Sequence, residues 1–201
     1  MEFVTDLILY QVATDMNYKV GDVFTFDSTT TNGQYNRVFN STYLHGEDRL
    51  SDYVSLVGTK KFKKFKSKQE VLDIGSALEA YDVITKELAI EEVRKELYPE
   101  YPSRFHCMYL SENKELAINN VDNFFKQNPK GKIYQAVAVK LNGKIFKAGD
   151  VYMSREGQSY NYYKQKAYKY WAQQNPSFVK EILFEGKAEI VEILKTKERV
   201  W

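Results

Sequence analysis

Apolar and polar positions predict strands near both ends of the chain and helices between them. Residues 6–13 are apolar and β-branched enough for a buried strand, and residues 23–26 follow the Gly21-Asp22 turn as a short extended piece. Residues 28–42 are rich in Thr, Asn and Ser, which predicts a loop.

The middle of the chain has helical periodicity. Residues 67–70 read Ser-Lys-Gln-Glu, a capping-box pattern, and the apolar positions from 71 to 97 predict one or two helices that end before Pro99. A strand is expected over 104–110. Ser111 is placed to cap a helix over 112–127.

The last third returns to strands around one more helix. Asn142-Gly143 is a strong hairpin dipeptide, so two strands are expected on either side of it, over 132–140 and 144–147. Residues 159–174 suit a helix, and 179–194 suit two strands about Gly186. The pattern predicts an α+β protein, with residues 1–201 forming a single domain.

Composition limits the class of protein further. The chain has 201 residues, 28% charged, with a formal net charge of +2, so no global charge favours nucleic acid or a membrane surface. Residues 7–10 are too short an apolar run for a membrane span, and Glu2 and Asp6 do not suit a secretory signal. With Cys107 alone, no intrachain disulfide can form, which favours a cytoplasmic protein without membrane partners.

Familiar catalytic motifs are missing. The chain has no G-x-G-x-x-G, no G-x-x-x-x-G-K-[ST], no H-E-x-x-H and no G-x-S-x-G. Two histidines cannot build a His-rich metal centre, so no metal is expected. A Cys-His nucleophile would need Cys107 with His45, because the adjacent His106 would face the opposite side of a strand; the alternative is that Cys107 is buried strand packing.

Lysine is concentrated in one cluster. Six lysines fall within residues 60–68, around Phe62 and Phe65, and the candidate nucleic-acid contacts among them are Lys60, Lys61, Lys63 and Lys64. Lysine can neutralise phosphates while phenylalanine stacks on bases. The alternative is an exposed strand edge on which lysine guards against aggregation.

Aromatic residues are concentrated in residues 160–171. At helical spacing Tyr160, Tyr163 and Trp171 lie on one stripe, which predicts core packing. Tyr162 and Tyr170 lie off that stripe and are therefore the candidates for an exposed role.

Three segments resemble motifs of the ADP-ribosyltransferase superfamily. Residues 181–194 resemble its last motif, in which a catalytic glutamate opens a strand, and Glu181 matches that glutamate. Residues 102–111 look like its central Tyr-x-Ser strand, and residues 9–14 look like its first strand. The similarity covers most of the chain, which also resembles an uncharacterised bacterial family, a domain of unknown function associated with this superfamily.

The resemblance implies a split antiparallel sheet that holds NAD in a cleft and cleaves its nicotinamide-ribose bond. It implies that Glu181 stabilises the oxocarbenium-like transition state and that Tyr109 packs by the nicotinamide ring. Gln11, in place of the usual His or Arg, would bind ribose hydroxyls. Ser111 could orient Glu181, and Arg104 is a candidate for the pyrophosphate.

Several alternatives stay open at this level. Glu185 and Glu189 are rivals of Glu181, and a two-residue register slip would place Glu185 on the same side. Because Gln11 leaves the family's usual triad incomplete, a non-catalytic module that binds nucleic acid or a protein competes with the enzyme, and a structural protein of a phage or mobile element is a third class. The leading hypothesis is an NAD-dependent ADP-ribosyltransferase that modifies a macromolecule, with RNA or DNA favoured over protein. By family analogy it could be a toxin or phage-defence effector with an antitoxin partner.

Overall fold

The computed structural model describes residues 1–40, 68–127, 132–174 and 180–199. Within them the chain forms an α+β fold, as expected from the sequence pattern. The strands are β1 (Glu2–Thr14), β2 (Val23–Phe26), β3 (Met108–Leu110), β4 (Ile133–Gly149) and β5 (Lys180–Glu198). The helices are α1 (Gly33–Phe39), α3 (Lys68–Leu97), α4 (Lys114–Gln127) and α5 (Tyr160–Trp171), with a 3₁₀ turn, η1, at Asp150–Met153.

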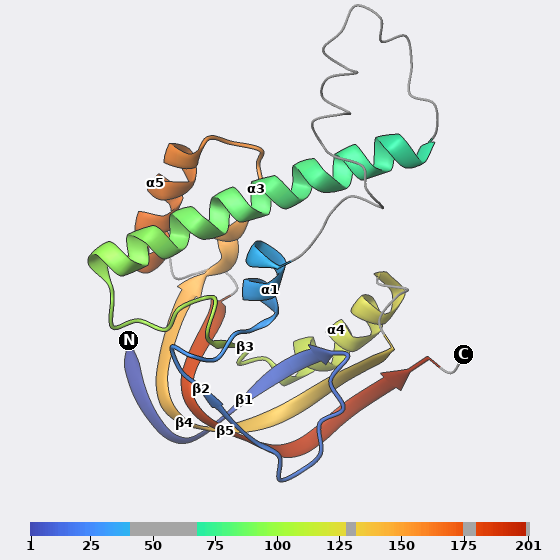
Figure 1. Cartoon of the computed structure of the whole chain (residues 1–201). Coiled ribbons are helices and arrows are strands. Elements are labelled where there is room, and N and C mark those ends of the chain that lie inside the picture. Colours follow the sequence, from blue (N-terminus) through green and yellow to red (C-terminus); the bar gives the residue numbers. More distant parts are fainter. Residues whose placement is uncertain (41–67, 128–131, 175–179, 200–201) are drawn as a thin grey trace, which may run out of the picture.

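The strands form one antiparallel sheet in the order β1-β4-β5-β2, and β3 also pairs with β5. The long strands β4 and β5 are strongly curved (Figure 1). Ser111, just after β3, forms a two-way backbone bridge with Tyr10 of β1. The short strand β3 therefore links β5 to β1.

Side-chain alternation divides the sheet into two faces. On β4, Val139, Leu141 and Ile145 belong to a core that β2 and β3 help to line. Phe146 and Ala148 face the other way, against α3 and α5. Further along that same face, α4 packs on the β4 residues Tyr134 and Ala136. Because successive side chains of a strand point to opposite faces, these assignments also place the cross-strand partners wherever the register is regular, which excludes the shifts at Val4/Leu7, Ala136/Val137 and Ala138/Val139.

The expected hairpin at Asn142-Gly143 is wrong. β4 runs through these residues as one strand, and β5 runs likewise through Gly186. Gly143 and Gly186 are cross-strand partners with φ of 157° and 141°. A Cβ on Gly143 would lie 2.3 Å from the Glu185 carbonyl oxygen. These glycines therefore permit a close backbone approach in the middle of a strand pair, where the sequence suggested turns.

The ranges of other helices and strands also differ from those expected. The expected loop over 28–42 contains α1, which Asn32 caps by accepting hydrogen bonds from the N–H groups of Gln34 and Tyr35. The strand expected over 104–110 is reduced to β3, and the residues before it form a turn. Asn113, rather than Ser111, accepts a backbone bond from the first turn of α4.

Candidate functional site

The turn before β3 fixes the backbone of Arg104. The amide nitrogen of Asn32 donates to the carbonyl oxygens of Arg104 and Cys107, both at 2.8 Å. The hydroxyl of Tyr109 donates to the same Arg104 carbonyl at 2.7 Å. The residue that caps α1 therefore also holds the turn that presents the Arg104 side chain.

The guanidinium of Arg104 joins three elements of the fold. Its Nε and Nη2 donate to the two carboxylate oxygens of Glu87 on α3, at 2.8 and 3.3 Å. Its Nη1 donates to the Tyr170 hydroxyl at 3.2 Å and to Oε1 of Glu181. Four hydrogen bonds therefore occupy most of the five N–H donors of the arginine.

Opposite charges balance in this buried network. Lys86, next to Glu87, places its Nζ 3.2 Å from a Glu87 oxygen and donates to the Met153 carbonyl at 2.8 Å. Lys86, Glu87 and Arg104 are all buried. With Glu181, the cluster holds two cations and two anions, the condition under which buried charges are tolerated.

The pKa values in the network follow from burial and pairing. Burial lowers the pKa of Lys86, even though Glu87 opposes that shift. Burial would raise the pKa of Glu87, but Arg104 and Lys86 outweigh it and hold that pKa below its ordinary value. Burial likewise acts against the charge on Arg104, yet Glu181 and Glu87 raise its pKa well above the ordinary range. Both partners of the Glu87–Arg104 pair are therefore charged at neutral pH.

Glu181 differs from the rest of the network in its exposure. Its side chain is 21% exposed, whereas that of Arg104 is 6% exposed. Arg104 and the Tyr170 hydroxyl, the latter at 2.7 Å, both bind Oε1. Among the described residues, Oε2 has no hydrogen-bond partner. The carboxylate is therefore anchored through one oxygen and presents the other.

Tyr109 lies beside this carboxylate network. It pairs with Leu183 across the sheet, so its ring faces the side that carries Glu181. The Arg104 guanidinium lies 5.3 Å from the centre of the Tyr109 ring and 5.5 Å from that of Tyr170. Burial raises the pKa of both phenols well above the ordinary value. Neither hydroxyl is therefore available as a base near neutral pH.

Two sequence-predicted residues lie apart from Glu181. Gln11 pairs with Val137 and therefore faces the core on the opposite side of the sheet, on the side that holds Tyr18. Ser111 Oγ accepts from the Asn113 N–H at 3.1 Å, and no hydrogen bond to Glu181 is present. The structure thus brings together Glu181, Arg104 and Tyr109, and leaves out Gln11 and Ser111.

Glu185 and Glu189, the alternatives to Glu181, each form a surface ion pair with a lysine on β4. Glu185 pairs with Lys144 at 2.6 Å, and Glu189 pairs with Lys140 at 2.7 Å, on the partly exposed surface of the sheet. The β4–β5 register is continuous from Gly143 to Gly149, so no slip moves Glu185 into the place of Glu181. Their geometry is that of surface cross-strand ion pairs.

Sequence reasoning did not identify Lys86 and Glu87 as members of the network, and it assigned Tyr170 the wrong role. Its side chain is fully buried, in contrast to the exposed role expected for it, while Tyr160 on the predicted core stripe is 37% exposed. The buried set on α5 is Tyr163, Ala167, Tyr170 and Trp171. Tyr170 follows Ala167 by three residues, a helical spacing that equally well describes one face.

The remaining sequence-predicted candidates add no described residue to this network. Cys107 is buried, and burial raises its pKa well above the ordinary value, which makes the thiol unreactive. Its proposed partner His45 lies outside the described residues, and so do the candidate nucleic-acid contacts Lys60, Lys61, Lys63 and Lys64.

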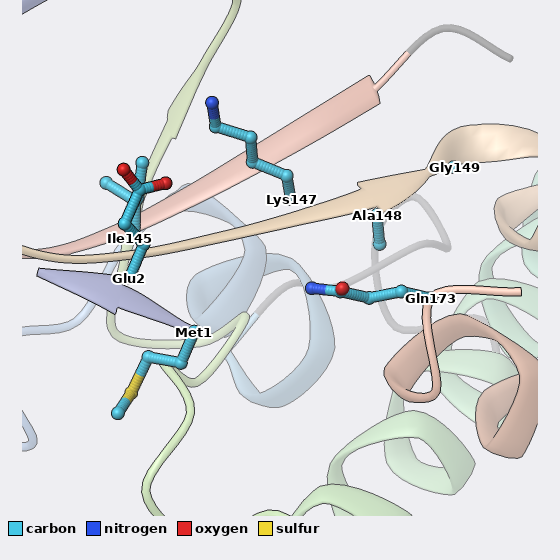
Figure 2. A pocket seen from close by; sticks show the side chains of 7 residues that line it. All are labelled: Met1, Glu2, Ile145, Lys147, Ala148, Gly149 and Gln173. Atoms are coloured by element: carbon cyan, nitrogen blue, oxygen red, sulfur yellow. The ribbon is translucent and has the colours of Figure 1, made fainter. Parts of the chain in front are cut away.

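A cavity of about 360 Å³ opens beside the carboxyl end of β4 (Figure 2). It is lined by Ala148 and Gly149, by Met1 and Glu2 at the start of β1, and by Gln173 after α5. Ala148 is the cross-strand partner of Glu181. The cavity therefore lies next to the strand segment that carries the carboxylate, although Glu181 does not line it.

Two further features concern ions and membranes. The described residues contain no group of three or more His, Cys, Asp or Glu side chains that could hold a metal ion. None of the helices in those parts of the chain combines the length and apolar character needed to cross a bilayer.

Comparison with known proteins gives a family without an activity. No curated protein matches the chain. The family model described as Protein of unknown function (DUF2441) matches residues 9–196. This agrees with the expected resemblance to an uncharacterised family, and the ADP-ribosyltransferase superfamily stays a prediction. Since the match covers nearly the whole sequence, the chain belongs to the DUF2441 family.

Proposed function

We propose that the protein is an NAD-dependent ADP-ribosyltransferase in which Glu181 is the catalytic carboxylate. The observation that carries the proposal is the way in which the Glu181 carboxylate is hydrogen-bonded. It opens β5, Arg104 and Tyr170 hold one of its oxygens, and the other has no described partner. A positioned carboxylate can stabilise the cationic ribose of a glycosyl-transfer transition state, a contribution of about 2.7–4 kcal/mol for one preorganised group.

The proposal gives Arg104 a role different from the one that the resemblance implies. Since Glu87, Tyr170 and Glu181 occupy four of its donor positions, Arg104 acts here as a positioning residue for Glu181. Gln11 has no part in this site because it faces the other side of the sheet. In this proposal Tyr109 supplies a ring wall beside the carboxylate.

The acceptor of the ADP-ribose is a macromolecule, with nucleic acid favoured over protein on the strength of the lysine cluster. The proposed setting is cytoplasmic, as a toxin or phage-defence effector that an antitoxin could restrain. These assignments rest on the sequence and on family analogy.

The experiment uses NAD labelled on its adenylate phosphate together with RNA, DNA or cell lysate as acceptor. Glu181→Gln keeps the size of the side chain and removes its charge, so label transfer should fall by about 10²–10³-fold. Glu185→Gln is the matched control, because that residue lies on the same face of β5 and its ion pair is with Lys144. Its transfer rate should stay near that of the wild type.

Either of two results would contradict the assignment of Glu181 as the catalytic carboxylate. Transfer that survives Glu181→Gln excludes Glu181 as the catalytic group, and transfer abolished by Glu185→Gln identifies the rival acid. Thermal unfolding of both variants separates loss of chemistry from loss of fold.

A non-catalytic binding module is the second candidate, and one observation favours it. Glu181 completes the balanced charge network of Lys86, Glu87 and Arg104, which is also what a structural carboxylate does. This candidate predicts no NAD consumption by the wild type with any acceptor, and binding of nucleic acid or a protein partner that weakens with salt.

A further inference from the structure

A second cavity, of about 450 Å³, lies between α1 and α3, away from Glu181. Tyr35 and Phe39 of α1 line it on one side, and Tyr160 at the start of α5 lines it as well. Phe105 and His106, from the turn that carries Arg104, complete the aromatic lining. Neither Arg104 nor Glu181 lines this space.

Four of the five rings that line the cavity, all except that of Tyr160, are packed into one cluster. Phe39 lies 4.7 Å from Tyr35 and 5.3 Å from Phe105 between ring centres. Tyr35 in turn lies 5.9 Å from the His106 ring. Phe39 nevertheless stays 50% exposed. A ring that is fixed by its neighbours and still open to solvent is suited to stack on a planar ligand.

The His106 ring adds a hydrogen-bond acceptor, and its contact with Thr30 shows which of the two ring nitrogens it is. Its Nδ1 lies 2.6 Å from the carbonyl oxygen of Thr30. A carbonyl oxygen can only accept, so Nδ1 carries the hydrogen. In the neutral ring Nε2 is then an acceptor, and no described residue donates to it. A ligand N–H can therefore bind at Nε2.

The carboxylates on the cavity wall are already paired, whereas Lys95, which also lines the cavity, has no ion pair among the described residues. Glu91 binds Arg94 at 2.8 Å, and Glu92 binds Lys164 at 2.7 Å. Because both carboxylates have their own partners, they do not require a cationic ligand, and the part of the ligand that stacks on Phe39 can be a neutral ring with an N–H donor.

We propose that this cavity binds an amino-bearing purine base, which stacks on Phe39 and donates an N–H to Nε2 of His106. Such a base can come from the adenosine half of a dinucleotide such as NAD or from a single-stranded nucleic acid. The inference stands independently of the transfer reaction, because it needs neither Glu181 nor Arg104.

Calorimetric titration of the full-length chain with adenosine and with purine riboside tests the proposal. Purine riboside keeps the ring but lacks the exocyclic amine and any ring N–H, so adenosine should bind about 2- to 12-fold tighter, the net value of one hydrogen bond. Adenosine that does not bind at millimolar concentration, or that binds no better than purine riboside, overturns the proposal.

Variants separate the stacking ring from the acceptor. Phe39→Leu removes an exposed ring and should weaken both ligands about tenfold. His106→Asn retains a donor near the Nδ1 position and removes the Nε2 acceptor, so it should erase the preference for adenosine. Tyr81→Leu, at an exposed tyrosine of α3 outside the cavity, is the matched control and should leave both affinities unchanged. If Phe39→Leu and His106→Asn leave the affinities for adenosine and purine riboside unchanged, the assignment is contradicted.

Competition then identifies the source of the base. NAD, an adenine-rich RNA oligonucleotide and its DNA counterpart are each titrated against bound adenosine, and the one that displaces it at the lowest concentration is the source. Glu181→Gln should keep wild-type affinity for adenosine, so failure of the transferase proposal is distinguishable from failure of this one.

Discussion

At the scale of single residues, Tyr170 connects two charged groups with one hydroxyl. It donates to Glu181 at 2.7 Å and accepts from Arg104 at 3.2 Å. Its ring is also part of the apolar core with Phe146 and Trp171. A buried hydroxyl of this kind orients the carboxylate and is itself held by packing, so its two contributions can be separated by a change that keeps the ring.

Tyr170→Phe should lower the free energy of unfolding by about 1–2 kcal/mol, because the ring remains while two buried hydrogen bonds are lost. The matched control is Tyr162→Phe, whose exposed hydroxyl binds Glu156 on the surface and should contribute less than about 0.5 kcal/mol. Urea denaturation measures both. If Glu181 is catalytic, Tyr170→Phe should also reduce kcat more than it changes KM. Equal stability of the two variants would show that the Tyr170 hydroxyl is not a structural anchor.

At the scale of elements, the pair of long strands depends on two facing glycines. Gly143 and Gly186 allow the backbones of β4 and β5 to approach so closely that a Cβ on either residue would meet main-chain atoms. Backbone atoms cannot turn aside as a flexible side chain can. The continuous pairing that positions Glu181 opposite Ala148 therefore rests on residues without side chains.

Gly143→Ala should destabilise the fold by at least about 1–3 kcal/mol, because the added methyl group meets the Glu185 carbonyl and the positive φ is strained. Gly75→Ala is the control. Gly75 lies on α3 with nothing within 4 Å of the added Cβ, so the change should stabilise the protein by about 0.5–1 kcal/mol. Denaturant midpoints give both values. A neutral Gly143→Ala would mean that the two strands can separate there without cost.

At the scale of the whole molecule, carboxylates connect elements that are distant in sequence. Glu87 joins α3 to the Arg104 turn, and Asp122 joins α4 to Lys195 and Lys197 of β5. Glu156 binds Lys166 of α5. Pairing holds the pKa of Glu87 below its ordinary value despite burial, and hydrogen bonds from lysine hold those of Asp122 and Glu156 at about 2.

These depressed pKa values determine how stability responds to acid. In the unfolded chain the carboxylates take up protons first, so the stability they contribute is present above about pH 4.5 and is lost as the pH falls toward 2. Thermal unfolding measured from pH 7 to pH 2 should therefore show a falling midpoint below pH 4.5.

The double variant Asp122→Asn/Glu156→Gln should have a flatter acid profile than the wild type. Glu115→Gln, at an exposed residue of α4 without an ion pair among the described residues, should leave the profile unchanged. A wild-type midpoint that rises or stays level between pH 4.5 and pH 2 would contradict this prediction.

The sequence by itself determined the elements that depend on local chemistry. The apolar positions from 71 to 97 and the helix expected over 159–174 correspond to α3 and α5, and the short extended piece expected over 23–26, after the Gly21-Asp22 turn, is β2. Arg104, Tyr109 and Glu181 were identified as site candidates from short motifs, and they meet in the structure.

The tertiary structure decided the features that depend on contacts distant in sequence. Asn142-Gly143 has the dipeptide of a turn, but its partner strand makes it the middle of a strand. The face of the sheet that receives Gln11 is set by its pairing with Val137. The burial of Tyr170 follows from the packing of α5 against β4 and β5. Local pattern specifies what a segment can form, whereas long-range pairing and packing decide which side chains meet, and so which carboxylate is held and exposed at once.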